Sequence, residues 1–258
     1  MSVFQSILLG IIQGLCEFLP VSSSGHLVLA QNLLGVSEGG LLFNTLLHVG
    51  TLAAVFAVYY RDIWEMIRHP IRSDLRYLVL ATIPAVAATL LFGDFFDAAF
   101  AGRFLGVSFL ATSVILYAGS KCHGHQTQIQ VKNSLLMGVW QAVAILPGVS
   151  RSGSTISGGM FAGLTRERAA RFSFLMSIPA ICGSLVFQAK DILSGEALGE
   201  MGFLAVAAGM IAAAVTGYLA IRFMLRLLQK KSLNGFALYT LVLGVLVLSD
   251  QLFFHIFF

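Results

Sequence analysis

Residues 8–25 read LLGIIQGLCEFLPVSSSG, and residues 136–153 read LMGVWQAVAILPGVSRSG. Each stretch begins like an apolar helix and then reaches a proline followed by serines and glycine. Because proline and glycine interrupt helices, neither the segment 3–34 nor the segment 131–163 can form one straight helix. The sequence therefore predicts two broken helical segments, which resemble each other with one-residue offsets around the prolines.

The composition is that of a membrane protein. Of 258 residues, 57% are hydrophobic and only 11% are charged, and the mean hydropathy is +0.87. A soluble domain of this size needs more polar residues to cover its surface. The first apolar run lacks a basic start and a small-residue cleavage pattern, so we expect no cleaved signal peptide. Crossing a bilayer takes about 20 residues of helix, and six segments are predicted to do so: 41–60, 77–95, 104–120, 172–189, 203–228 and 236–257.

The basic residues lie in short segments between the apolar runs, a pattern that indicates membrane orientation and not nucleic-acid binding. One set of connecting segments holds most of the Lys and Arg, whereas the opposite set holds only Arg103 and Lys190. The first set should be cytoplasmic. Six spans are consistent with this assignment only if 3–34 enters and leaves from outside and 131–163 enters and leaves from the cytoplasm.

The expected fold is therefore an all-α polytopic membrane protein, a single membrane domain over 1–258, with six transmembrane helices plus two re-entrant helical hairpins. Residues 1–120 and 121–258 would be the halves of an inverted-topology repeat, whose centres meet near the midplane. Chance similarity of the two breaks is the alternative. A break leaves backbone groups without helical partners, which is tolerated at membrane depth only in a buried or cavity-lining position, so both breaks are candidate sites.

The first break gathers polar side chains. Gln13 and Glu17 lie four residues apart and share one helix face, and a carboxylate within a membrane segment is usually functional. The hydroxyl groups that follow, Ser22, Ser23 and Ser24, suit the N-cap of a second helix, whose free N–H groups favour an anion. His26 adds a group that can accept and donate a proton near neutral pH. Helix capping alone, or a structural histidine, is the alternative.

The second break places Arg151 among hydroxyl groups and glycines at a helix start. A guanidinium in an apolar segment needs an anionic partner, and its planar donors suit phosphate oxygens. The neighbouring candidates for phosphate binding are Ser150, Ser152 and Thr155. The alternative is an Arg151–Glu17 ion pair that only holds the two halves together.

Three stretches, 13–17, 20–26 and 147–155, resemble the signatures of the bacterial undecaprenyl-diphosphate phosphatase family, also called the bacitracin-resistance family. The resemblance extends over nearly the whole chain, including 83–85 and 172–175. Many relatives have Glu where this chain has Gln13, which weakens any mechanism that needs two carboxylates for a metal. The resemblance implies hydrolysis of undecaprenyl diphosphate to the monophosphate and phosphate, which recycles the lipid carrier of cell-wall synthesis.

The roles that we assign on this basis are hypotheses. Arg151 and the loop hydroxyls would stabilise the phosphoryl group, and Ser23 would be the nucleophile with His26 as its base. Glu17 would either orient His26 or hold a divalent cation, Mg or Ca, that bridges the diphosphate. Attack by His26 itself or by water stays open. We expect no organic cofactor.

A transporter or flippase of polyprenyl phosphate lipids is the main alternative, because broken helices in inverted repeats are also typical of transporters. Transport would need an anion site but neither a nucleophile nor a base. A purely structural scaffold would leave Glu17, His26 and Arg151 buried without purpose. We expect a multi-pass protein of the bacterial inner membrane with a site open to the periplasmic side. Gly209 and Gly217 permit close helix contacts, either within the chain or in a homodimer.

Overall fold

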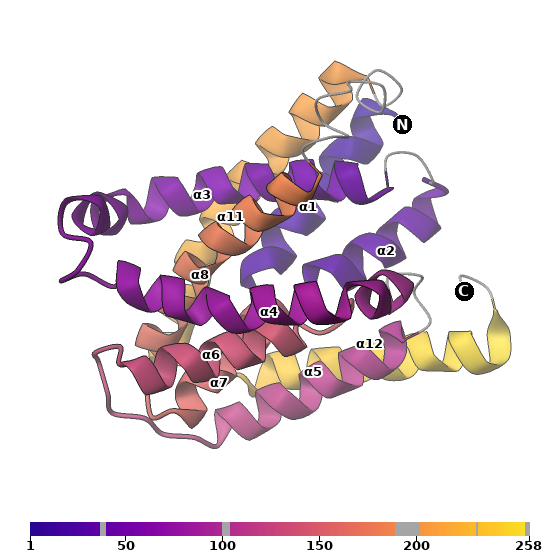
Figure 1. Cartoon of the computed structure of the whole chain (residues 1–258). Helices are drawn as coiled ribbons and strands as arrows, with labels where there is room; N and C mark the ends of the chain where they lie inside the picture. The colour runs from indigo at the N-terminus through magenta and orange to yellow at the C-terminus, as the bar shows by residue number, and fades with distance from the viewer. Residues whose placement is uncertain (37–39, 100–103, 189–201, 231, 256–258) are drawn as a thin grey trace.

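A computed structural model of the chain describes residues 1–36, 40–99, 104–188, 202–230 and 232–255. These residues form helices joined by turns, a five-residue π-helix and one isolated β-bridge, with no β-strand among them. The all-helical prediction is thus confirmed for the described part of the chain. In Figure 1, α1 begins and α12 finishes at one end of the molecule, whereas the turn between α3 and α4 lies at the other end.

Both segments that were predicted to break do so. The first forms α1 (Val3–Phe18) and α2 (Ser23–Leu34), and the second forms α6 (Val131–Val143) and α7 (Arg151–Phe161). Within each pair the two helices pack against each other, so each pair is a hairpin of two short helices.

The long helices are α3 (Gly40–Arg68), α4 (Leu75–Ala99), α8 (Arg166–Phe187), α11 (Phe203–Lys230) and α12 (Asn234–Ser249), which continues as the π-helix η1 (Asp250–Phe254). These five are long and apolar enough to cross a membrane, judged on the described residues. The segment predicted as a sixth span is α5 (Leu105–Ser120), an apolar helix of only 16 residues. At 1.5 Å per residue it is about 24 Å long, shorter than a typical hydrocarbon core.

Helix ends differ from the predicted spans where charged residues extend a helix beyond its apolar part. α3 continues to Arg68, past a departure from helical geometry at Tyr59. α8 begins six residues before the predicted span because Thr165 caps it, accepting a hydrogen bond from the backbone N–H of Arg168. Residue 189 and the last residues of the chain, which the predicted spans included, lie outside the described residues.

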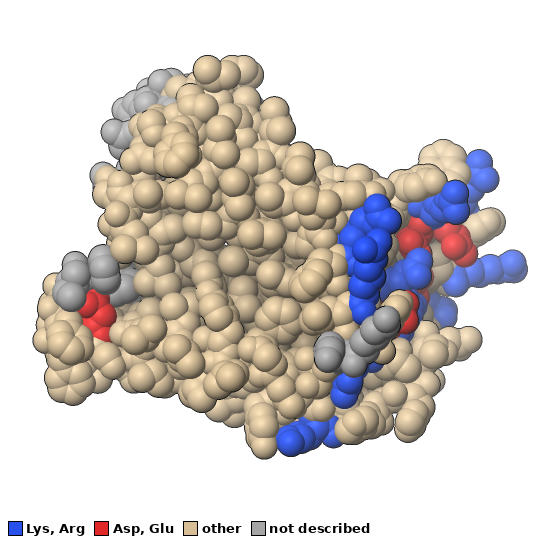
Figure 2. Space-filling model, turned by 180° about the vertical axis from the view of Figure 1, so that it is seen from behind, with Lys and Arg blue, Asp and Glu red and all other residues tan. Residues whose placement is uncertain are grey.

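The outer surface agrees with a membrane environment. Figure 2 shows Lys and Arg gathered at one end of the molecule, while the flank between the ends carries almost no charge on this face. Large apolar side chains are exposed on many helices, which is typical of a lipid-facing surface; examples are Phe4, Leu90, Leu91, Val114, Ile211 and Phe223. The structure thus supports a multi-pass membrane protein.

Close helix packing sets one face of α1 against α11. A Cβ atom on Gly14 would lie 2.0 Å from Oγ1 of Thr216, so only glycine permits this approach. Gly209 packs against Ser6, and Gly217 against Phe18, so these two glycines of α11 make contacts within the chain. Phe18 is fully buried, and its ring meets that of Phe174 edge-on at 5.4 Å. The end of α1, which carries Glu17, is therefore held firmly.

Candidate active site

The first break is a tight turn between α1 and α2. α1 ends at Phe18, and Leu19 adopts an extended conformation (φ −72°, ψ 140°), as the residue before proline generally does,. Ser22 has φ +72°, an unusual value for a residue with a side chain,. Its hydroxyl accepts a hydrogen bond from the N–H of Gly25 at 3.4 Å and so caps α2. The turn sets the start of α2 beside the end of α1.

The second break is held by α5. Gly148 has φ +89°, and a Cβ atom there would lie 2.6 Å from Cβ of Ser108, so the turn requires glycine,. The hydroxyl of Thr112 donates to the carbonyl of Gly148 and accepts from the N–H of Ser150, each at 3.0 Å. Ser150 then caps α7, accepting from the N–H of Gly153 at 3.0 Å.

The two breaks meet inside the molecule. Arg151, at the start of α7, forms an ion pair with Glu17 near the end of α1. The hydroxyl of Ser152 donates to the carbonyl of Leu19 at 3.1 Å. The starts of α2 and α7, where backbone N–H groups lack helical partners, therefore both lie next to this ion pair.

Glu17 is the centre of this cluster. It is only 6% exposed, and its Oε1 contacts Arg151. Its Oε2 accepts hydrogen bonds from Oγ of Ser23 at 2.6 Å and from Nε2 of Gln13 at 3.1 Å. Nε2 of His48 lies 3.4 Å from the same oxygen. The cluster thus combines a hydroxyl group, a carboxylate, a guanidinium and an imidazole.

Sequence reasoning did not identify His48 as a site residue. It lies on α3 in a stretch without other ionisable residues, with Nδ1 2.6 Å from the carbonyl of Asn44. A signal was present, because an ionisable residue in a membrane span is a functional candidate. Nothing in its immediate neighbourhood in the sequence connects it with Glu17, however, and only the fold brings the two together.

Arg151 also donates through Nη1 to the carbonyl of Ser173 on α8, at 3.1 Å. The hydroxyl of Thr155 lies 2.6 Å from that of Ser173 and donates to the carbonyl of Arg151 at 2.8 Å. Thr155 therefore braces the start of α7, and Ser150 caps it. Both were predicted to bind phosphate, and in this structure both hydroxyls are engaged within the protein.

The hydrogen bonds of the His26 ring go to residues outside the Glu17 cluster. The described residues that hydrogen-bond to its ring are Ser22, through the carbonyl 2.7 Å from Nδ1, and Tyr239, through the hydroxyl 2.7 Å from Nε2. Ser23 is thus paired with Glu17 and not with His26, which differs from the expected arrangement. The hydroxyl of Ser24 lies 3.3 Å from that of Ser22.

A cation site is only partly provided by the protein. The described residues contain no group of three or more His, Cys, Asp or Glu side chains that could hold a metal ion. Glu17 supplies the carboxylate of the cluster, and the neighbouring Gln13 supplies an amide and not a second carboxylate. Mg²⁺ commonly binds through one or two carboxylates together with substrate phosphates, so Glu17 fits a cation that the substrate helps to hold.

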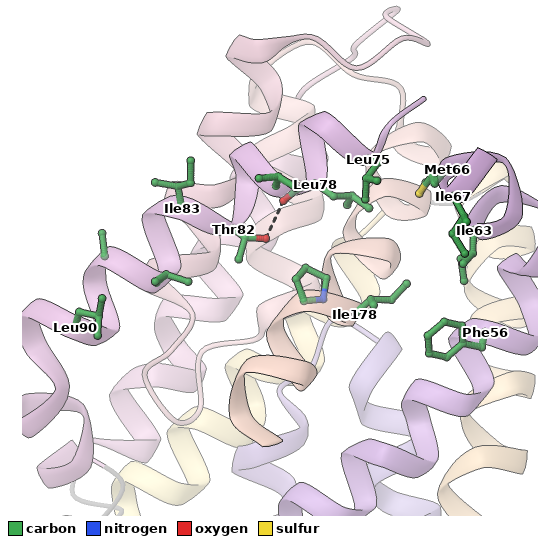
Figure 3. A pocket seen from close by; sticks show the side chains of 14 residues that line it. Phe56, Ile63, Met66, Ile67, Leu75, Leu78, Thr82, Ile83, Leu90 and Ile178 are labelled. Atoms are coloured by element: carbon green, nitrogen blue, oxygen red, sulfur yellow. Dashed lines mark hydrogen bonds between the residues drawn. The ribbon is translucent and has the colours of Figure 1, made fainter. Parts of the chain in front are cut away.

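A groove of about 610 Å³ lies elsewhere, between α3, α4 and α8 (Figure 3). Its lining is apolar, with residues such as Phe56, Leu78 and Ile178, and the hydroxyl of Thr82 is occupied by the carbonyl of Leu78 at 2.8 Å. None of the predicted site residues lines it. The groove suits hydrocarbon and cannot hold a diphosphate.

Comparison of the sequence with known proteins identifies its family. Residues 6–246 match the family described as bacitracin resistance protein BacA. The chain belongs to this family. It is 41% identical over 255 residues to undecaprenyl-diphosphatase 4 of Bacillus thuringiensis subsp. konkukian, covering 97% of this chain and 98% of the relative.

Other relatives of this member of the BacA family are similarly close. The undecaprenyl-diphosphatase of Methanobrevibacter smithii is 40% identical over 277 residues, covering 98% of this chain and 99% of the relative. That of Carboxydothermus hydrogenoformans is 40% identical over 256 residues, covering 97% and 98%. The likeness therefore includes every element that builds the cluster around Glu17.

Proposed function

We propose that this protein is an integral-membrane phosphatase that hydrolyses undecaprenyl diphosphate to undecaprenyl phosphate and inorganic phosphate. Relatives that match nearly the whole chain carry the name undecaprenyl-diphosphatase. The reaction would return the carrier lipid to cell-wall synthesis. The observation that carries the proposal is the contact of one carboxylate, that of Glu17, with both Ser23 and Arg151.

Ser23 is the proposed nucleophile. Its hydroxyl already donates to Glu17 at 2.6 Å, so the carboxylate can take the proton as Oγ attacks the terminal phosphorus,. The bond from that phosphorus to the bridging oxygen breaks, and the lipid monophosphate leaves. Water then hydrolyses the phosphoserine, and Glu17 returns the proton to Ser23.

Arg151 supplies the positive charge for the phosphoryl group. Its planar donors match phosphate oxygens, and the starts of α2 and α7 add backbone N–H groups that favour an anion. Phosphoryl transfer depends mainly on positioning and on stabilising charge on the equatorial oxygens. Arg151 pairs with Glu17, and a bound phosphate would replace part of that contact. An ion pair with Glu17 and a role in phosphate binding are thus compatible for Arg151.

A divalent cation, Mg or Ca, would be held by Glu17 together with oxygens of the substrate. The support for this is the chemistry of the cluster, in which a diphosphate must approach a carboxylate of the same sign. A bound cation would neutralise charge on the diphosphate. Gln13 contributes an amide to the cluster where many relatives were expected to have a second carboxylate, so this chain would depend on the substrate for the remaining ligands.

The proposed membrane arrangement has six spans, with α5 as the sixth, and two re-entrant hairpins, α1–α2 and α6–α7. Residues 1–120 and 121–258 would form an inverted repeat whose breaks meet at the site. The end that gathers Lys and Arg in Figure 2 would face the cytoplasm of a bacterial inner membrane,. The α1–α2 hairpin would then enter from the periplasmic side and open the site to that side.

The experiment is phosphate release from undecaprenyl diphosphate by the purified protein in detergent. We expect release by the unchanged protein and loss of it in Arg151→Ala, with His26→Ala strongly impaired. Arg222→Ala is the matched control, because Arg222 is exposed and its Nη1 donates to the hydroxyl of Tyr218. Binding of the lipid without phosphate release would contradict the enzyme and favour a flippase.

A further inference from the structure

Tyr239 completes the surroundings of His26 although it belongs to none of the sequence motifs. It lies on α12, 213 residues after His26, with its hydroxyl 2.7 Å from Nε2. The two rings are stacked, with centroids 5.7 Å apart and planes 13° from parallel. The contact therefore joins α12 to the start of α2, beside the first break.

The direction of this hydrogen bond follows from the other ring nitrogen. Nδ1 of His26 is 2.7 Å from the carbonyl oxygen of Ser22, which can only accept,. Nδ1 therefore carries a proton, and Nε2 of the neutral ring is the acceptor. The hydroxyl of Tyr239 is then the donor to Nε2.

The arrangement around His26 is constrained from several sides. The carbonyl that accepts the hydrogen bond from Nδ1 belongs to Ser22. Ser22 has a positive φ, which residues with side chains rarely adopt,. Such strain persists only where surrounding structure enforces it, and it clusters at functional sites. The edge of Phe109 packs against the imidazole with centroids 5.5 Å apart. His26 thus has one orientation, with Nε2 directed to Tyr239.

Tyr239 differs from every other tyrosine of the chain. The chain has six, and the other five each lie against an Arg or Lys side chain. Tyr239 lies instead against a histidine. That histidine, His26, follows Ser23 by three residues on α2, about one helical turn,. Tyr239 is 47% exposed.

We propose that Tyr239 is a catalytic residue that connects His26 with the attacking water in the second half of the reaction. This inference rests on the proposed phosphatase function. The water oxygen bonds to the phosphorus of phospho-Ser23 while one water proton passes to the Tyr239 oxygen. The Tyr239 proton passes at the same time to Nε2 of His26. The phosphorus–oxygen bond to Ser23 breaks, and the serine oxygen takes back the proton held by Glu17.

This step gives His26 a function that its position allows. The hydroxyl of Ser23 donates to Glu17, and the ring of His26 bonds to Ser22 and Tyr239 instead. Two proton acceptors would divide the reaction between them. Glu17 would act when Ser23 attacks the substrate, and His26 would act through Tyr239 when water attacks the phosphoserine.

The test uses Tyr239→Phe in the full-length protein, since this change removes the hydroxyl and keeps the stacked ring. We expect the steady-state rate of phosphate release to fall at least about tenfold, and phosphorylated Ser23 to accumulate, seen by mass spectrometry of quenched reactions. Tyr117→Phe, a change in a tyrosine that contacts Lys121 instead, should do neither. In a His26→Ala background, Tyr239→Phe should have no further effect.

Two outcomes would overturn the inference: phosphate release by Tyr239→Phe within about twofold of the unchanged protein, or slow release without phosphoserine. If Tyr239→Phe fails to fold, its thermal unfolding temperature in detergent is lowered, and Tyr239→Trp is used instead because it keeps an aromatic ring but moves the donor. Tyr239→Trp should then show slow phosphate release with accumulated phosphoserine, and release at the unchanged rate would overturn the inference. Absence of phosphate release from the unchanged protein would instead contradict the proposed function itself.

Discussion

Arg151 and Glu17 are joined in an ion pair across 134 residues of sequence. Each belongs to a different broken segment, and each lies within one turn of its break. The pair is only slightly exposed, at 16% and 6% of the side-chain surface. Two helix starts and the proposed nucleophile lie beside it, so this contact is the centre of the proposed phosphate site.

Replacing Arg151 by Lys keeps the charge but removes the planar pair of donors that reaches both Glu17 and the carbonyl of Ser173,. We expect kcat/KM for phosphate release to fall by about 100-fold or more, the effect typical of losing a donor to the transition state. Steady-state kinetics with the diphosphate lipid measure this. A decrease of less than about threefold would show that point charge alone is sufficient.

Ser23→Ala should abolish turnover, because no other described hydroxyl group donates to Glu17. The rate should fall by at least about 1,000-fold, as for other enzymes that lose a nucleophile. Ser24→Ala is the matched control, since its hydroxyl contacts only that of Ser22 among the described residues, and it should retain most activity. If Ser23→Ala stays active while Ser24→Ala does not, the nucleophile has been assigned to the wrong serine.

The structural and catalytic roles of the ion pair can be separated. Glu17→Gln alone leaves a buried guanidinium without its anion, which generally costs about 3–5 kcal/mol. Adding Arg151→Met should recover much of the thermal stability in detergent, because a buried pair can often be replaced by apolar side chains. Activity should remain absent in the double variant. Recovery of phosphate release together with stability would mean that the pair serves only to hold the halves together.

The cation proposal predicts that chelation lowers phosphate release and that Mg or Ca restores it. Gln13→Glu would place a second carboxylate beside Glu17, where Nε2 of Gln13 now donates at 3.1 Å. Repulsion between like charges at this distance is relieved by a bound cation. The variant should therefore need a lower cation concentration for half-maximal activity. An unchanged or higher requirement would argue against Glu17 as a cation ligand.

The sequence predicts those features of the fold and the site that depend on residues close together in the chain. Pro20 and Pro147 specify the breaks locally, so the sequence predicted both hairpins and the polar residues at their turns. The sequence did not predict the extension of α3 to Arg68. Charged residues after an apolar run can either end a helix or continue it, so the run alone does not fix the helix end. Ser23 pairs with Glu17 and not with His26 because of the direction in which the turn at Ser22 sets α2. The spacing of residues in the sequence does not determine that direction.

His48 and Tyr239 show why the rest could not be predicted. Each lies in a long apolar helix far from the motifs, and a tyrosine in such a helix is ordinarily a residue of the membrane interface. Their relation to the site depends on the packing of α3 against α1 and of α12 against α5, which brings Tyr239 to His26. Only a tertiary contact reveals it: His48 at 3.4 Å from Glu17, and Tyr239 at 2.7 Å from His26.

The central claim is that both breaks bind one phosphate group. A structure of the protein with a methylene-bridged, non-hydrolysable diphosphate lipid tests it most directly. The account predicts that the terminal phosphorus lies between Arg151 and Oγ of Ser23, with the Glu17–Arg151 contact opened. A diphosphate bound elsewhere, for example among the arginines of the basic end, with that ion pair unchanged, would contradict it.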